Sequence, residues 1–263
     1  MLIATRAGSY GVSLICKSAV KRKDWQPDMF FKKIYSTIRS FAFTLFHGPL
    51  WKRELRRRNA AVVENGEHEI SVITDRLKAL GADVFADYGT LLGLVRDGHI
   101  IQWDYDIDFG IHINSFFTWR DLEEAMKNLG YIKNHQFYFN GIITEQNYSK
   151  GKLFIDFFMH FETDRGSVCY AYDRFRKDRD YPSEFSWDVI EYVTPNIRGT
   201  SVFNISSSLH ASIPDNAEKY LSLIYGDNWR TPDPNWKELN SSAASLLKDK
   251  YGIIEEFNNV SDA

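Results

Sequence analysis

Three carboxylates separated by single residues carry the strongest chemical signal in this chain. Asp104, Asp106 and Asp108 alternate with apolar or aromatic residues in the stretch IQWDYDIDFGIH at 101–112. A β-strand points successive side chains to opposite faces, so a strand here places all three carboxylates on one face. Carboxylates this close raise one another's pKa unless a cation lies among them. The pattern predicts a site for a hard divalent metal ion, and the alternative is a solvated edge strand that uses charge against aggregation.

A glycine–threonine pair lies about a dozen residues upstream. Gly89 and Thr90 stand between a predicted strand at 83–89 and a predicted short helix at 90–98. Glycine allows close approach of the backbone, threonine can cap a helix, and the free N–H groups of a helix start bind anions. We therefore expect a phosphate site, with an ordinary helix cap as the alternative. Arg96, near the far end of this helix, could reach phosphate, or could pair with Asp97 or one of the three aspartates, and both interpretations stay open.

A further carboxylate, separate from the three aspartates above, lies within the aromatic strand KLFIDFF at 152–158. Asp156 is its acid, and a buried, unpaired carboxylate is costly. It could complete the metal site or activate a nucleophile, or it could pair with Lys152. His160 would share its strand face and is a weaker candidate for the site. The remaining histidines, such as His135, stand singly and are typical of hydrogen-bonded structural residues.

These features together predict transfer of a phosphoryl group. A metal ion held by three or four carboxylates would balance the phosphate charge, and the glycine–threonine turn would position the phosphates. A metal ion or a base must then activate the acceptor hydroxyl.

The elements needed to hold these residues form an α+β plan. Besides the strand at 83–89 and the helix at 90–98, we expect helices at 59–80 and 117–131, a strand at 100–113 and a hairpin at 136–161. The remainder is expected to be loop-rich with short helices, notably one at 217–226. This order predicts a mixed sheet rather than a regular βαβ array. The second face of the strand at 100–113 would join the core through Tyr105, Ile107, Phe109 and Ile111. Trp229 and Arg230 could line a substrate site after the last helix, which is otherwise a core helix.

The N-terminal region differs from the rest in composition. We expect an appendage at 1–58 and a catalytic domain at 59–263, with little pattern over the first 25 residues. Residues 28–58 mix aromatic and basic side chains. This segment could lie on an anionic membrane surface, or it could be a helix packed on the domain with its charges in solvent.

Composition excludes several classes of protein. A net charge of −3 and a pI near 6.2 argue against a general nucleic-acid binder. Cys16 and Cys169 form neither a metal-binding spacing nor a disulfide framework, which fits a reducing cytosol. No apolar stretch is long enough to span a membrane, and the N-terminus is not typical of a signal peptide. We therefore expect a cytoplasmic protein, peripheral at the membrane if residues 28–58 bind it.

The stretch ADYGTLLGLVRDGHIIQWDYDIDFGI at 86–111 resembles the signature of the LicD family, which includes the fukutin-type proteins. KLFIDFF resembles the second acidic strand of that family. IPDNAEKYLSLIYGDNWRTPDP at 213–234 resembles its C-terminal element. The resemblance spans roughly residues 60 to 236 in three ordered blocks.

The resemblance implies a nucleotidyltransferase-like mixed β-sheet flanked by helices. It also implies an enzyme that uses Mg²⁺ or Mn²⁺. Family members move a phospho-alcohol, such as phosphocholine, ribitol phosphate or glycerol phosphate, from a CDP-activated donor to a sugar hydroxyl. The acceptor would be a surface or secreted glycan, for example lipopolysaccharide or capsule.

The family pattern also implies roles for particular residues. Gly89 and Thr90 match the phosphate turn, Asp106 and Asp108 the main metal ligands, and Asp156 the third carboxylate. Asp104 matches the first acid of the triple, with a less defined role. Gln102 stands where many members have Pro. Tyr105 stands where many bacterial members have Asp, a form that resembles the fukutin-related branch. These departures touch no expected ligand but leave the donor open.

Two alternative functions remain. One is a binding or scaffold protein that keeps the fold without catalysis and docks through its basic N-terminal segment. The other is a nucleotidyltransferase that adds NMP to a small molecule with the same site chemistry.

Overall fold

The computed structural model describes residues 29–174, 181–233 and 236–257, with side chains from residue 50 onward. The chain divides into two compact units, Met1–Leu50 and Trp51–Ala263. Helix α1 (Met29–Ala79) begins in the first unit and ends in the second. The first 25 residues, for which little pattern was found, and most side chains of the basic segment at 28–58 lie outside the described residues. The boundary between residues 58 and 59 stays a prediction. No described helix combines the length and apolarity needed to cross a membrane.

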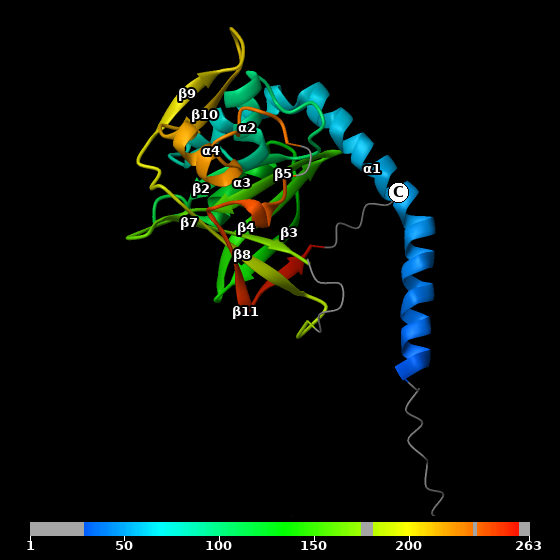
Figure 1. Ribbon diagram of the computed structural model, residues 1–263. Coiled ribbons are helices and arrows are strands. Elements are labelled where there is room, and N and C mark those ends of the chain that lie inside the picture. The colour runs from blue at the N-terminus through cyan, green and yellow to red at the C-terminus, as the bar shows by residue number, and fades with distance from the viewer. Residues whose placement is uncertain (1–28, 175–180, 234–235, 258–263) are drawn as a thin grey trace, which may run out of the picture. The chain divides into compact units, whose positions relative to one another are not determined.

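The second unit is built on a large mixed sheet, which confirms the α+β prediction (Figure 1). The strand order is β1-β2-β5-β4-β3-β11-β8-β7-β6. Strands β2 and β5 pair in parallel, and the other neighbours pair antiparallel. The first five of these strands are β1 (Asp83–Ala86), β2 (Ile107–His112), β5 (Leu153–Met159), β4 (Ile142–Lys150) and β3 (Ile132–Phe139).

The expectation of a loop-rich C-terminal half is wrong. Four further strands extend the main sheet, and two form a small separate sheet. They are β6 (Phe161–Thr163), β7 (Gly166–Asp173), β8 (Ser186–Thr194) and β11 (Ala244–Glu256), with β9 (Thr200–Asn204) and β10 (His210–Pro214) apart. Strand β11 shows why the alternation of apolar and polar residues did not predict these strands. It bulges between Leu246 and Tyr251, and most of its residues are not buried, so apolar and polar residues do not alternate along it.

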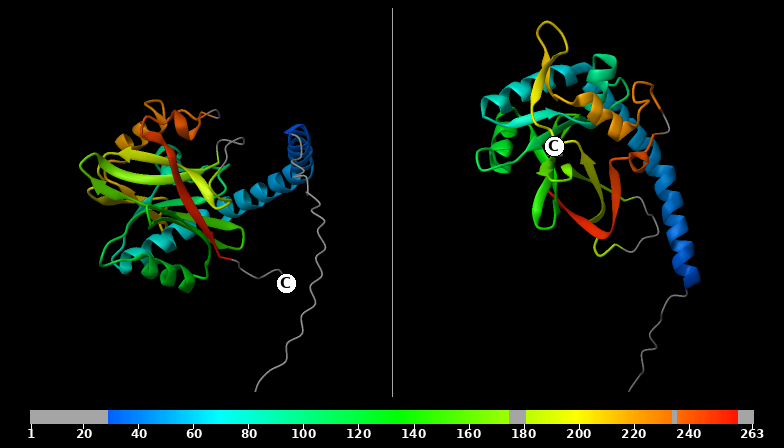
Figure 2. Two further views of the ribbon diagram at one scale, coloured as in Figure 1. Left: turned by 90° about the horizontal axis from the view of Figure 1, so that it is seen from below. Right: turned by 60° about the vertical axis from the view of Figure 1, so that its left-hand side comes forward.

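The main sheet is strongly curled (Figure 2). Strand β7 packs against β5 and β4 across the curl, far from their place in the strand order. Phe137 of β3 and Tyr172 of β7 stack with ring centroids 4.2 Å apart. The twist of successive strands accumulates into this shape, and the inside of the curl becomes a space in which side chains of several strands meet.

Helices cover the other parts of the sheet. The C-terminal half of α1 buries Ile70, Ile73 and Leu77 in the core, which confirms a helix at 59–80, although it begins earlier. The short helices are α2 (Tyr88–Asp97), α3 (Trp119–Asn128) and α4 (Ala217–Tyr225), with one 3₁₀ turn at Glu238–Asn240. Helix α4 buries Tyr220, Leu221 and Ile224, as expected of a core helix.

Candidate active site

The parallel pairing of β2 and β5 brings two distant acids together. Asp108 lies opposite Asp156 in the register of these strands. Residues in register point to the same face of a sheet, so both carboxylates face the inside of the curl. Ile107 and Phe109, which flank Asp108 on the strand, are buried, as expected for side chains on the opposite face of the sheet. Both acids line an open pocket of about 510 Å³.

Asp104 and Asp106 reach the same pocket from a loop. The predicted strand at 100–113 begins only at Ile107, so the expectation of three acids on one strand is wrong. Asn59 of α1 holds the loop, because its side-chain amide donates to the backbone oxygens of Gln102 (2.9 Å) and Asp104 (2.7 Å). The loop nevertheless turns both carboxylates toward Asp108 and Asp156.

Two aromatic residues of this loop are outside the core. Tyr105 was expected to pack inside with Ile107 and Phe109, but 42% of it is exposed, and 67% of Trp103 is exposed. The reason is the loop itself: without β-strand alternation, every second residue need not face the core. Tyr105 lines the acid pocket, where burial raises its pKa to about 12 and the nearby acids add to that shift.

The four acids create a strongly negative environment. Burial raises the pKa of Asp106 and Asp108 well above the usual value, and repulsion by neighbouring acids adds to it. Burial also raises the pKa of Asp104. Burial raises the pKa of Asp156 to about 6, although a hydrogen bond from Asn147 (2.6 Å) and the charge of Arg58 oppose the shift. The pocket therefore favours a bound cation.

Gly89 is required for the close packing of this site. A side chain at this position would place its Cβ 2.7 Å from Oδ2 of Asp104. Helix α2 begins at Tyr88 rather than at residue 90, and Asp87, not Thr90, caps it by accepting a hydrogen bond from the Tyr88 N–H at 2.7 Å. The hydroxyl of Thr90 accepts a hydrogen bond from the Asp108 N–H at 2.9 Å, so Thr90 positions the acid strand from a buried place.

Arg96 does not reach the acid pocket. Its guanidinium pairs with both oxygens of Asp97, at 2.9 and 2.7 Å. This contact agrees with one of the two interpretations left open by the sequence. Arg96 lines a neighbouring hollow instead.

Lys152 and His160 serve other parts of the fold. Lys152 bonds to Glu54 at 2.8 Å, so the suggested pairing with Asp156 is wrong. His160 follows the end of β5, is buried, and contacts Oδ2 of Asp87 through Nε2 at 2.8 Å. The hydroxyl of Tyr220 donates to Oδ1 of the same Asp87 at 2.5 Å. Both residues fix the helix cap next to the site rather than line the pocket.

Sequence reasoning missed several polar lining residues, Glu238 among them. Arg58, His135, Glu145 and Asn147 all face the acid pocket. Glu145 and Asn147 alternate on β4, which is a usable signal only once β4 is known to pair with β5. Arg58 was assigned to the N-terminal appendage, but its guanidinium lies 3.5 Å above the ring of Phe154 in β5. Burial and the charge of Arg58 lower the pKa of His135 to about 4.

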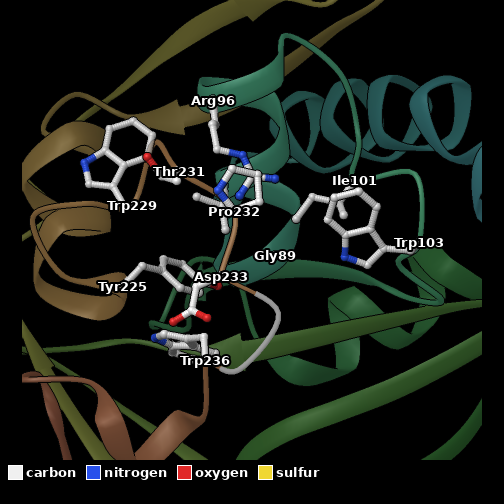
Figure 3. Close-up of a pocket in the computed structure, with 11 residues that line it drawn as sticks. Gly89, Arg96, Ile101, Trp103, Tyr225, Trp229, Thr231, Pro232, Asp233 and Trp236 are labelled. Carbon is white, nitrogen blue, oxygen red and sulfur yellow. The ribbon is translucent and has the colours of Figure 1, made fainter.

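A second hollow of about 460 Å³ adjoins the acid pocket, and the two share Gly89, Tyr225 and Trp236 (Figure 3). Its walls are mainly aromatic or apolar. Trp103 lies on one side, and Trp229 and Tyr225 lie on the other (Figure 3). Such a hollow suits a flat ring that joins a charged group in the neighbouring pocket.

The fold and the site define an α+β domain in which paired strands and a loop present acids beside the first turn of a helix. Residues 81–192 match the family model described as "LicD/FKTN/FKRP, nucleotidyltransferase domain". The resemblance to the LicD family is therefore confirmed over this part of the chain. The matched range includes Gly89, the acid triple and Asp156.

Individual relatives match over a shorter range. A segment of 49 residues is 41% identical to "Ribitol 5-phosphate transferase FKRP" of Mus musculus and equally to the protein of that name in Homo sapiens. The match covers 19% of this chain and 10% of each relative. The chain thus aligns with about a tenth of the length of these curated relatives.

Proposed function

We propose that this protein is a metal-dependent transferase that moves a phospho-alcohol from a CDP-activated donor to a sugar hydroxyl of a surface or secreted glycan. Phosphocholine, ribitol phosphate and glycerol phosphate are the candidate groups. The observation that carries the proposal is the convergence of Asp104, Asp106, Asp108 and Asp156 in one open pocket beside Gly89. The LicD match supports the transferase class, and the ribitol phosphate transferase among the relatives supports a phospho-alcohol as the group transferred.

The residues of the pocket fit a hard divalent metal ion. Four carboxylates with raised pKa values line one pocket, and Mg²⁺ or Mn²⁺ prefers such oxygen ligands. Asp106, Asp108 and Asp156 would hold the ion, and Asp104 would add to them from the loop. When bound, the ion would neutralise charge on the phosphate oxygens.

The chain's own residues have distinct tasks in this reaction. An acceptor oxygen forms a bond to the phosphorus that carries the alcohol, the bond between the two phosphates breaks, and CMP leaves. A carboxylate of the pocket takes the hydroxyl proton. The first turn of α2 offers the backbone N–H groups of Gly89 and Thr90 to the phosphates, because those of Tyr88 and Leu91 donate to the side chain and the carbonyl of Asp87. Asp87 is itself held by His160 and Tyr220, so this turn is rigid.

The aromatic hollow would take the ring at one end of a substrate. It meets the acid pocket at Gly89, Tyr225 and Trp236, so a ring there leaves an attached phosphate close to the acids. A cytosine base is the ring we assign to it, because base–aromatic stacking needs no exact pattern of hydrogen bonds.

The test is CMP release. The purified protein would be incubated with a panel of CDP-alcohols, Mg²⁺ and candidate glycans, and CMP and the modified glycan would be quantified by mass spectrometry. Asp106→Asn and Asp108→Asn should abolish release, whereas Asp164→Asn, at an exposed loop position, should not. Equal release by all three variants would overturn the site assignment.

The same assay separates the two alternatives. A small molecule that carries NMP, in place of free CMP, would favour nucleotidyl transfer. An absence of turnover with every donor, together with binding to anionic vesicles, would favour a scaffold. We also propose a peripheral membrane contact through residues 28–58. Lys52, Arg53 and Arg56 are exposed, and their replacement by Gln should weaken vesicle binding if this contact exists.

A further inference from the structure

We propose that a second divalent cation binds in the acid pocket, held by His135, Glu145 and Asp156. Each of these residues offers one ligand atom, and the three atoms lie within 4.8 Å of one another. Among the residues that the structure describes, no other group of three His, Cys, Asp or Glu side chains brings its ligand atoms this close together. The site differs from the acid triple, because two of its three ligands lie outside the LicD-type motifs quoted above.

Strand register explains why the three side chains meet. His135 of β3 lies opposite Asn147 of β4, and Asn147 lies opposite Asp156 of β5. These three residues therefore form a row across neighbouring strands on one face. Glu145 is two residues before Asn147 on the same strand, so it shares that face and is a diagonal neighbour of both His135 and Asp156. All four residues line the pocket inside the curl.

Glu145 supplies an independent reason for a cation. Its side chain is only 9% exposed, and the nearest ring nitrogen given for it, Nε2 of His135, is 3.9 Å from Oε1. That distance is too long for a hydrogen bond. Within the described part of the chain, the structure gives the Glu145 carboxylate no hydrogen-bond donor. A buried carboxylate in that state is costly, and a metal ion between it and His135 would remove the cost.

Arg58 lines the pocket, but in the part of the chain that the structure describes its guanidinium does not pair with the carboxylates of this cluster. Arg58 pairs with Glu54 at 3.9 Å and stacks on Phe154. Asn147 donates to Oδ1 of Asp156 at 2.6 Å and so orients that carboxylate, as residues around metal ligands commonly do.

The donor set indicates which metal binds. One imidazole nitrogen and two carboxylate oxygens suit Mn²⁺, Co²⁺ or Zn²⁺, whereas Mg²⁺ and Ca²⁺ prefer oxygen alone. Asp156 would then be common to this site and the acid-triple site. Paired metal sites that clamp phosphate have this general form.

The test measures metal binding directly and requires no transfer activity. Full-length, metal-free protein would be titrated with Mn²⁺ by calorimetry and with Co²⁺ by visible absorption, which reports the coordination of the ion. The wild type should bind two ions. Glu145→Gln and His135→Ala should lose one of them, with a larger change in Kd than the roughly 10–100-fold typical of residues around the ligands.

Two sets of variants make the outcome specific. The matched controls His68→Ala and Glu124→Gln change exposed residues and should keep both ions. Asp106→Asn should lose the acid-triple ion but keep the Co²⁺ signal of the imidazole site, so the two sites can fail separately. Undiminished Co²⁺ binding and spectrum in Glu145→Gln, whose shape is unchanged, would overturn the proposal. A Co²⁺ spectrum that is the same in His135→Ala as in the wild type would overturn it as well.

Discussion

The hydroxyl of Thr90 accepts a hydrogen bond from the backbone N–H of Asp108 at 2.9 Å. This bond ties the first turn of α2 to the first residues of β2, and the Asp87 N–H donates to the Asp108 carbonyl at 3.0 Å in the same junction. The helix start and the acid strand are therefore one structural unit.

Thr90→Val should weaken this junction. The substitution keeps the side-chain shape but leaves the part-buried Asp108 N–H without its acceptor, at a cost of about 1–3 kcal/mol. Urea unfolding should report the loss, and CMP release should fall with it because Asp108 is no longer fixed. Thr90→Ser, which keeps the hydroxyl, should restore most of both quantities. Equal stability of the Val and Ser variants would contradict the structural role given to the hydroxyl.

Gly89→Ala should separate stability from function. Alanine favours a helix over glycine by up to about 1 kcal/mol, so the variant should unfold no more easily than the wild type. Its Cβ would displace the Asp104 carboxylate, which lies 2.7 Å away and can swing aside. Metal affinity and CMP release should therefore fall. In the background of Asp104→Ala the same change should have little further effect, and a full additional loss there would show that Gly89 acts through something other than Asp104.

His112 should make stability depend on pH. Burial lowers the pKa of His112, but the hydrogen bond to Asp83 (2.8 Å) and its charge outweigh burial, so the net shift is upward from 6.5. Nε2 lies 3.4 Å from Glu162 without a well-formed hydrogen bond. A raised folded-state pKa means that this stabilisation is fully present below pH 6.5 and is lost as pH rises through the raised value.

His112→Gln should flatten that part of the stability profile. The measurement is Tm as a function of pH, from below 6.5 to above the raised pKa of His112. His99→Gln is a suitable control, because His99 contacts the carbonyl oxygen of Ile100 rather than an acid. A His112 variant that keeps the full slope of the wild type would disprove the assignment.

Trp236→Ala should weaken donor binding. The aromatic hollow is proposed to stack a base, and stacking of a base on an aromatic side chain contributes about 1–3 kcal/mol. KM for the CDP-alcohol, or Kd for CMP, should rise accordingly, whereas the acceptor KM should change little. Phe116→Ala removes an aromatic side chain that is exposed and lies outside the hollow, so it should leave both constants unchanged. A rise confined to the acceptor KM would assign the hollow to the sugar.

The sequence alone predicted local elements such as helices, but it did not predict which distant strands pair. The α+β class, the helix at 59–80 and the core helix at 217–226 all follow from short-range periodicity, and the structure contains them. Asp108 and Asp156 could be singled out because a carboxylate within an apolar strand is unusual. Their geometry depends on the β2–β5 pairing, which spans more than 40 residues of chain.

The missed features share that dependence on distant partners. Glu145 and Asn147 are ordinary polar residues until β4 is placed between β3 and β5. Strands β7, β8 and β11 lack a clean alternation, because β7 and β8 each bury several successive residues and most of β11 is not buried. Thr90 was selected as a helix cap or phosphate ligand, yet its partner is a backbone N–H that no motif encodes.

Strand β11 links the two halves of the main sheet by pairing with β3 on one side and β8 on the other. It is the last strand of the main sheet in chain order, so during synthesis the ribosome delivers every other strand of the sheet before it. Until β11 emerges, β3 and β8 each present an unpaired edge, a state prone to association with other chains. The wall of the acid pocket that includes Ile254 is also missing until then. Completion of this enclosure is thus expected to be a late event that depends on long-range pairing, and such pairing is slow.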